Sequence, residues 1–194
     1  MRTPSVSANA VFLVGFMGAG KSSVGRALGQ RLNWLFEDLD DRIAHRAGRT
    51  VAEIFRDSGE PAFREAEHAA LREVIEDLHG GVARVIALGG GAFAQQRNAE
   101  LIAAAAVPTV FLDAAVDELW KRCCQQATDA GVERPLLQSM KQFRELYAVR
   151  RTHYSKAALK IDTGNRAVEV VADEIAKVLD LKKIAIRTEE GEVE

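Results

Sequence analysis

Cysteine is nearly absent from this sequence of 194 residues, which contains only the adjacent Cys123 and Cys124. Two neighbouring thiols provide neither a disulfide framework nor the spaced ligand pairs of a structural zinc site. They are typical of reduced thiols in a cytosolic protein. We therefore expect a cytoplasmic protein whose stability comes from an apolar core.

Two further features are missing. The chain has no excess of basic residues, because 26 Lys and Arg stand against 28 Asp and Glu, and this balance argues against a nucleic-acid partner. No run of about 18 uncharged apolar residues is present, so we expect no membrane span. The first ten residues, MRTPSVSANA, lack the apolar region of a secretory signal. We also expect the protein to be a monomer. The balanced charge does not exclude a local basic site for a small anion.

The sequence contains short apolar segments that alternate with segments of helical periodicity, which is typical of an α/β fold with a parallel sheet covered on both faces. We expect strands at 11–14, 34–40, 83–91, 107–113 and 158–162, and helices at 21–32, 41–47, 51–58, 61–78, 98–106, 115–126, 140–154 and 167–179. This order predicts a single domain over 9–180 with a five-stranded sheet in three αβα layers. Residues 1–8 and 181–194 are expected to be frayed ends, and the polar segment 127–137 is a candidate lid.

One motif with a specific mechanism is GFMGAGKSS, residues 15–23, which directly follows the apolar run at 11–14. Gly15, Gly20, Lys21 and Ser22 fit the P-loop pattern G-x-x-x-x-G-K-[ST] in its required place between a strand and a helix. Glycines let backbone N–H groups turn toward phosphate oxygens, and the helix adds its positive N-terminal end. Lys21 is expected to reach the β- and γ-phosphates, and Ser22 to bind Mg²⁺. The motif therefore predicts binding of a nucleoside triphosphate, with Ser23 near the α-phosphate.

Two acidic residues, Asp38 and Asp40, end the second expected strand. Alternation along an extended segment would place both on one face, where ligands of such sheets gather. One carboxylate would then support the metal through water and the other would hold a substrate hydroxyl. The alternative is that Asp40 is only a helix N-cap within an acidic loop.

Three further groups are candidates for an acceptor site. Arg64 and Glu67 share a helix face and are candidates for binding a substrate. The alternative is that they form an ordinary surface ion pair. Three glycines, Gly89 to Gly91, follow the third strand and indicate a ligand against bare backbone, or else a flexible turn. Arg150 and Arg151, followed by Tyr154, suit a carboxylate, unless they form a solvated helix face.

The candidate lid carries ERPLL, in which Arg134 precedes a proline. A mobile arginine near a phosphate supplies the positive charge that phosphoryl transfer requires. We therefore expect Arg134 to act on the transferring group.

Taken together, these motifs resemble the shikimate kinase family. The P-loop, D-x-D, F-R-x-x-E at Phe63 to Glu67, the triple glycine, R-P-L-L and R-x-x-x-Y occur in the family's order, and the resemblance extends over 11–179. It implies a P-loop fold of nucleoside-monophosphate-kinase type. It also implies phosphorylation of the 3-hydroxyl of shikimate by ATP with Mg²⁺, on the route to chorismate and aromatic amino acids.

The resemblance also assigns roles to matching residues. Lys21, Asp40 and Arg134 would be catalytic, and Ser22 and Asp38 would hold the metal. The residues expected to bind ATP are Gly18, Ala19, Gly20, Lys21, Ser22, Ser23, Arg122, Arg134 and Arg166. Those expected to bind shikimate are Asp40, Arg64, Glu67, Gly89, Gly90, Gly91 and Arg150, with Glu67 orienting the arginines.

The sequence departs from the family at three places. The usual R-x-P-L-Y is RRTHY here, so that Thr152 and His153 replace a proline and a leucine. The segment from Arg122 to Arg134 is several residues longer, and the proline often found near the adenine is missing after Arg166.

Two other functions fit parts of the pattern. A related small-molecule kinase, for gluconate or an amino analogue of shikimate, would keep the P-loop without needing Asp40, Arg64 and Arg150 together. A non-catalytic ATP-binding module would be expected to lose Lys21, Asp40 or Arg134, all of which are present.

Overall fold

The computed structural model describes residues 9–130 and 139–184. Its centre is a parallel sheet of five strands in the order β2-β3-β1-β4-β5. The strands are β1 (Ala10–Val14), β2 (Leu35–Asp38), β3 (Arg84–Ala87), β4 (Thr109–Asp113) and β5 (Leu159–Asp162). The predicted α/β fold with a five-stranded parallel sheet is therefore confirmed.

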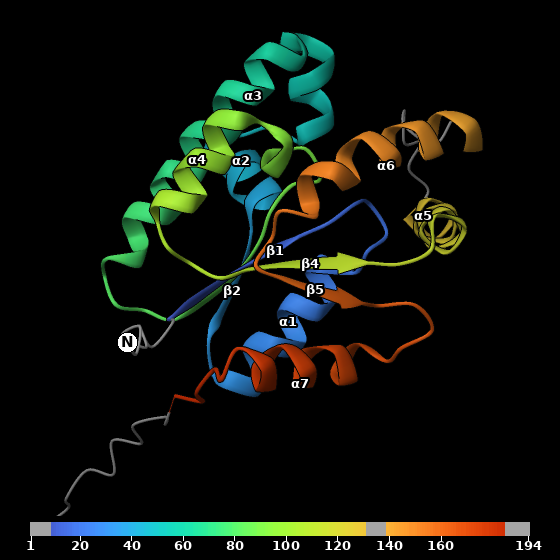
Figure 1. The fold of residues 1–194 in the computed structure, drawn as a ribbon. Coiled ribbons are helices and arrows are strands. Elements are labelled where there is room, and N and C mark those ends of the chain that lie inside the picture. Colours follow the sequence, from blue (N-terminus) through green and yellow to red (C-terminus); the bar gives the residue numbers. More distant parts are fainter. Residues whose placement is uncertain (1–8, 131–138, 185–194) are drawn as a thin grey trace, which may run out of the picture.

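Helices cover both faces of this sheet, as Figure 1 shows. α1 (Lys21–Leu32) and α7 (Val168–Val178) pack side by side on one face. The opposite face carries α2 (Leu39–Ala47), α3 (Val51–Leu78), α4 (Gln96–Ala104) and α6 (Met140–Tyr154). α5 (Val116–Ala130) follows β4, and a 3₁₀ turn, η1 (Ala92–Ala94), follows β3.

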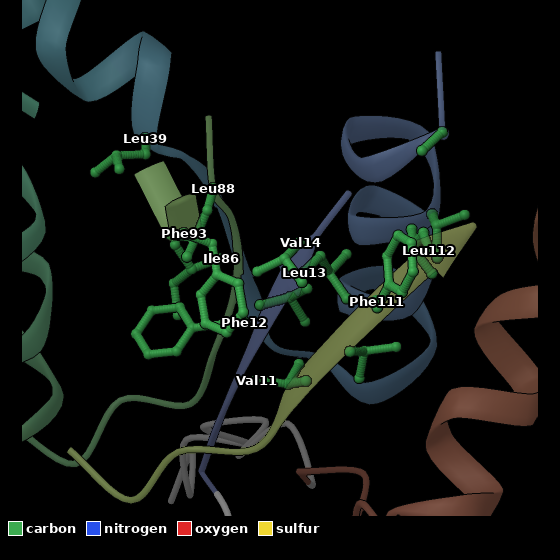
Figure 2. Packing of buried hydrophobic residues seen from close by; sticks show 14 of the residues in the cluster. Val11, Phe12, Leu13, Val14, Leu39, Ile86, Leu88, Phe93, Phe111 and Leu112 are labelled. Carbon is green, nitrogen blue, oxygen red and sulfur yellow. The ribbon is translucent and has the colours of Figure 1, made fainter. Parts of the chain in front are cut away.

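The core forms around β1, whose five residues are all buried. Its side chains lie between those of β3, such as Ile86, and those of β4, such as Phe111 (Figure 2). A strand covered on both faces needs a continuous apolar run, which AVFLV provides. This central strand fixes the start of the P-loop at the carboxyl edge of the sheet.

Two helices have the predicted bounds, because α1 spans 21–32 and α6 spans 140–154 as expected from the sequence. The segments predicted at 51–58 and 61–78 form one continuous helix, α3, which is interrupted by a break at Gly59 with φ 79° and ψ 173°. Pro61 follows the break, at a first turn whose N–H groups need no helical partner. The break turns the first part of α3 away from the rest.

The prediction that Asp38 and Asp40 alternate along one strand is wrong. β2 ends at Asp38, whose carboxylate caps α2 by accepting a 3.1 Å hydrogen bond from the backbone N–H of Asp40. Asp40 therefore lies in the first turn of α2, and the N-cap is Asp38 instead of Asp40. A short polar side chain that satisfies a free N–H favours an earlier helix start than the alternation suggested.

Two expected segment ends also differ. α5 continues to Ala130, so the first four residues of the candidate lid 127–137 are helical, and Arg134 lies outside the described residues. At the other end, Leu181 is buried and the Ile184 N–H donates to the Leu32 carbonyl at 2.9 Å. Residues 181–184 are therefore held against the domain.

Within the described ranges, no helix is long and apolar enough to cross a membrane.

Candidate active site

A cavity of about 370 Å³ opens at the carboxyl ends of β1, β2 and β3. It brings together most of the residues that the sequence singles out. The lining includes Gly18, Gly20, Lys21, Ser22, Ser23, Asp38, Asp40, Arg64, Glu67, Gly89, Gly90, Gly91 and Arg150. Gly18 and Arg150, which are 132 residues apart in the sequence, thus line one site. Loops that leave the same edge of a parallel sheet converge in this way.

The predicted phosphate cradle joins β1 to α1. Gly18 has φ 78°, and a Cβ there would lie 2.6 Å from the Leu119 carbonyl oxygen, so that only glycine fits. The Lys21 ammonium donates to the carbonyl oxygens of Gly15 at 3.0 Å and Phe16 at 3.2 Å. Burial lowers the pKa of Lys21, although the carboxylates of Asp40 and Asp38 oppose this shift. The amine therefore lies at the N-terminus of α1, where two carbonyl oxygens accept its hydrogen bonds.

The first hydroxyl of α1 faces the end of β2. Ser22 Oγ donates a 2.7 Å hydrogen bond to Asp38 Oδ2, while the other oxygen of that carboxylate caps α2. A hydroxyl and a carboxylate at the mouth of a phosphate cradle are hard oxygen donors of the kind Mg²⁺ prefers. The donor set therefore fits a magnesium ion that keeps part of its water shell.

Asp40 is a largely buried carboxylate that lines the cavity. Its Oδ1 has no hydrogen-bond partner among the described residues. Burial, together with the neighbouring charge of Asp38, raises the pKa of Asp40 above its ordinary value, although Lys21 opposes this shift. A buried acceptor with a free lone pair and a raised pKa is suited to accept a hydrogen bond, or a proton, from a bound hydroxyl.

The second acid, Glu67, has only 1% of its surface exposed. Arg64 Nη1 donates to both of its oxygens, at 3.2 and 3.0 Å, and Arg64 also pairs with Glu60. Burial raises the pKa of Glu67, while the guanidinium of Arg64 opposes that shift. The alternative of a surface ion pair is therefore wrong for Arg64 and Glu67, because the carboxylate lies inside and fixes the guanidinium at the cavity wall.

The three glycines after β3 allow these side chains to approach the backbone. A Cβ on Gly91 would lie 2.6 Å from Arg64 Nη1, and one on Gly89 would lie 2.7 Å from Asp40 Oδ1. Neither distance is tolerated between non-bonded atoms, so bare backbone is required for the arginine and the aspartate to sit where they do. The run of glycines therefore shapes the site wall and is more than a flexible turn.

Arg150 reaches the cavity from α6, which continues unbroken to Tyr154. Thr152 stands in this helix where the family pattern has a proline. The Arg150 guanidinium lies 5.8 Å from the centre of the Phe16 ring, and Tyr154 donates a hydrogen bond to the Gly90 carbonyl. Two arginines, Arg64 and Arg150, thus line the same cavity. Arg151 differs, because it pairs with Asp113 behind the helix.

Two further predicted residues, Arg122 and Arg166, lie outside this cavity. Arg122 donates to the carbonyl of Gly18 at 3.4 Å and to that of Thr163 at 2.7 Å, so it flanks the cradle. Arg166 pairs with Glu174 of α7 and donates to the Asp162 carbonyl at 2.9 Å. Arg134 is not among the described residues.

The sequence reasoning missed several residues that line the cavity: Met17, Val51, Phe55, Leu88 and Gln126. Phe55 and Phe63 stack with ring centres 4.4 Å apart across the break at Gly59. Apolar residues at helical spacing look the same whether they face the core or a site. For Phe55, therefore, no local signal separated the two.

Comparison with known proteins gives a consistent result. The family model described as shikimate kinase matches residues 17–180. The shikimate kinase of Geobacter sulfurreducens is 42% identical over 180 residues, which cover 91% of this chain and 93% of that protein. The shikimate kinase of Streptomyces avermitilis is 40% identical over 176 residues, with 89% and 96% covered.

A solved structure of shikimate kinase from Acinetobacter baumannii in complex with shikimate has a TM-score of 0.78 and 33% identity to this chain. The matched region covers 88% of this chain and 92% of the Acinetobacter baumannii chain. A family model and relatives of this identity, each covering most of the chain, leave one assignment: the chain belongs to the shikimate kinase family.

Proposed function

We propose that this protein transfers the γ-phosphoryl group of ATP to the 3-hydroxyl of shikimate, giving shikimate 3-phosphate and ADP. The observation that carries the proposal is that one cavity joins a P-loop to a buried carboxylate and two arginines. Shikimate has one carboxylate and several hydroxyls, and this cavity offers a complementary group for each. Membership of the family supports the same substrate.

On the donor side, the backbone of residues 18–23 and the Lys21 ammonium would bind the ATP phosphates. Lys21 now rests on two carbonyl oxygens of the loop, from which it can turn toward the β- and γ-phosphates. Ser22 and Asp38 would hold Mg²⁺, the carboxylate through a water molecule. The metal would neutralise charge on the phosphates when bound, and the chain's part is to present oxygen donors at the right edge of the cradle.

On the acceptor side, the guanidinium groups of Arg64 and Arg150 would grip the shikimate carboxylate, because a planar fork of donors matches two oxygens. Glu67 would orient Arg64, which it already contacts with both oxygens. The glycines at 89–91 would let the ring lie against bare backbone. Asp40 would then receive the hydroxyls at the other end of the substrate.

In the chemical step, the 3-hydroxyl oxygen forms a bond to the γ-phosphorus while the bond from that phosphorus to the bridging oxygen of ADP breaks. The hydroxyl proton passes to Asp40, whose raised pKa favours accepting it. Lys21 stabilises the charge on the transferring group, and we assign the same role to Arg134. Arg122 and Arg166 would flank the adenine end of the nucleotide.

We further propose that the protein is a monomer and that it acts in the cytoplasm, where ATP is supplied.

The experiment is a coupled assay of ADP release with Mg-ATP and shikimate, with the product identified by phosphorus NMR. We expect shikimate to be preferred over gluconate and over nucleoside monophosphates by at least about 100-fold in kcat/KM. Preference for gluconate or an amino analogue of shikimate would favour the related small-molecule kinase. Binding of both ligands without turnover would instead favour the non-catalytic module.

A further inference from the structure

A second charged cluster lies behind α6, outside the proposed reaction site. It borders a hollow of about 690 Å³ that includes Asp113, Tyr147, Arg151 and Lys160 but none of the residues assigned to ATP or shikimate. Asp113 ends β4, and its side chain is only 8% exposed. A buried carboxylate with no part in the reaction raises the question of what it holds.

The carboxylate of Asp113 binds α6 at two points. Tyr147 donates its hydroxyl to Asp113 Oδ1 at 2.7 Å, and Arg151 Nε lies 3.4 Å from Oδ2. From β5, Lys160 adds an ion pair at 2.9 Å. Burial alone would raise the pKa of Asp113, but the hydrogen bonds from Lys160 and Tyr147 lower it overall, so the charge persists. The two contacts from Tyr147 and Arg151 to this buried carboxylate hold α6 against the end of β4.

These two points of contact flank Arg150. Tyr147 and Arg151 are four residues apart and share one face of the helix, whereas Arg150 lies about 100° around from Arg151. A helix held by one face cannot rotate about its axis without breaking those contacts. The direction in which Arg150 projects is therefore tied to the pairing of Tyr147 and Arg151 with Asp113.

Phe16 of the P-loop completes the link. The Tyr147 ring meets the Phe16 ring edge-on, with centres 5.5 Å apart, and Phe143 does the same at 4.9 Å. The guanidinium of Arg150 lies over that same ring. Phe16 also gives its carbonyl to Lys21. One buried aromatic side chain thus joins the cradle to the face of α6 that carries Arg150.

From this arrangement we infer that Asp113 and Tyr147 are positioning residues, which set the rotation of α6 and thereby aim Arg150 at the substrate carboxylate. The inference rests on the proposed function, because it takes that carboxylate as the partner of Arg150. The competing explanation is that the cluster only stabilises the fold. The two differ in what they predict for shikimate binding.

The test is Tyr147→Phe, which removes the hydroxyl and keeps the ring against Phe16. We expect the KM for shikimate to rise about fivefold, the effect of one lost hydrogen bond. The kcat and the KM for ATP should stay within about twofold. Lys160→Met is the matched control, because it removes another partner of the same carboxylate without touching α6, and it should leave the shikimate KM unchanged.

A double-mutant cycle separates positioning from stability. If Tyr147 acts through Arg150, Tyr147→Phe should lower kcat/KM for shikimate about fivefold in the wild type and have almost no effect in an Arg150→Ala background. Equal losses in both backgrounds, or an equal rise in KM for Lys160→Met, would overturn the inference while leaving the proposed function intact. A wild-type protein without activity on shikimate would overturn both.

Discussion

Ser22 donates its hydroxyl hydrogen bond to Asp38 across 2.7 Å, and so connects the first turn of α1 to the end of β2. The same carboxylate caps α2. One side chain therefore links the predicted metal site to the helix that carries Asp40.

This contact makes a prediction about magnesium. Ser22→Ala should raise the Mg²⁺ concentration for half-maximal activity at least about tenfold, because a hard oxygen donor is lost. Titration of activity with Mg²⁺ at saturating ATP measures the change. Ser23→Ala serves as the comparison, since Ser23 is not assigned to the metal. An equal shift in both variants would contradict the assignment of Ser22 to the metal site.

Lys21→Ala should reduce turnover at least about 100-fold while the fold persists. The variant loses the side-chain cation of the cradle, and one strong electrostatic stabiliser of the transition state has about this effect. Steady-state rates, with circular dichroism as the check on folding, decide the matter. Near-normal turnover in a folded variant would be incompatible with the phosphate cradle.

Asp40→Asn should impair shikimate turnover much more than nucleotide binding. Because the pKa of Asp40 is raised, kcat/KM for shikimate in the wild type should fall as pH drops through that raised pKa, at a higher pH than an ordinary aspartate would give. Rate profiles between pH 5 and pH 9, with nucleotide affinity measured by calorimetry, test both statements. If nucleotide affinity falls as much as shikimate turnover, Asp40 belongs to the metal site instead of the shikimate site.

The same shift has a consequence for stability. The folded state holds the Asp40 proton to a higher pH than the unfolded state does, so stability from this group falls as pH rises through the window above the ordinary value of 3.8. Asp40→Asn should therefore raise the melting temperature at pH 8 by a few degrees. The gain should vanish near pH 4, where the wild-type carboxyl is protonated. A gain that does not depend on pH would contradict this reasoning.

Gly91→Ala should raise the KM for shikimate at least about tenfold. The new Cβ would lie 2.6 Å from Arg64 Nη1 and displace the guanidinium that is held by Glu67. The KM for ATP in the same variant is the internal control, because the three atoms nearest to that Cβ all belong to Arg64 and none to the cradle. A normal shikimate KM would show that shikimate binding does not depend on the present position of Arg64.

Arg134→Ala and Arg64→Ala should affect different constants. An interaction made mainly in the transition state lowers kcat, whereas one made throughout binding raises KM. We expect Arg134→Ala to lower kcat more than it raises KM, and Arg64→Ala to raise the shikimate KM strongly. Kinetics of the two variants, side by side, provide the measurement. A change confined to KM in Arg134→Ala would contradict its assignment to the transferring phosphate.

The sequence by itself determined the elements and the cradle, because both depend on local signals. The periodicity of KSSVGRALGQRL and the G-K-S start fixed α1 to the residue, and the apolar run AVFLV specified a strand buried on both faces. These signals lie within a dozen residues of chain. The error at Asp40 arose at the same scale, where alternation and capping compete and the cap of Asp38 prevails.

The tertiary structure decided which side chains meet. Glu67 looked like half of a surface pair, but α3 packs it inside beside Asp40 and Gly89. Asp113, Tyr147 and Phe16 are 34 to 131 residues apart and become neighbours only because β4 lies beside β1 and α6 lies across them. Burial and strand order are properties of the whole chain, and no local pattern contains them.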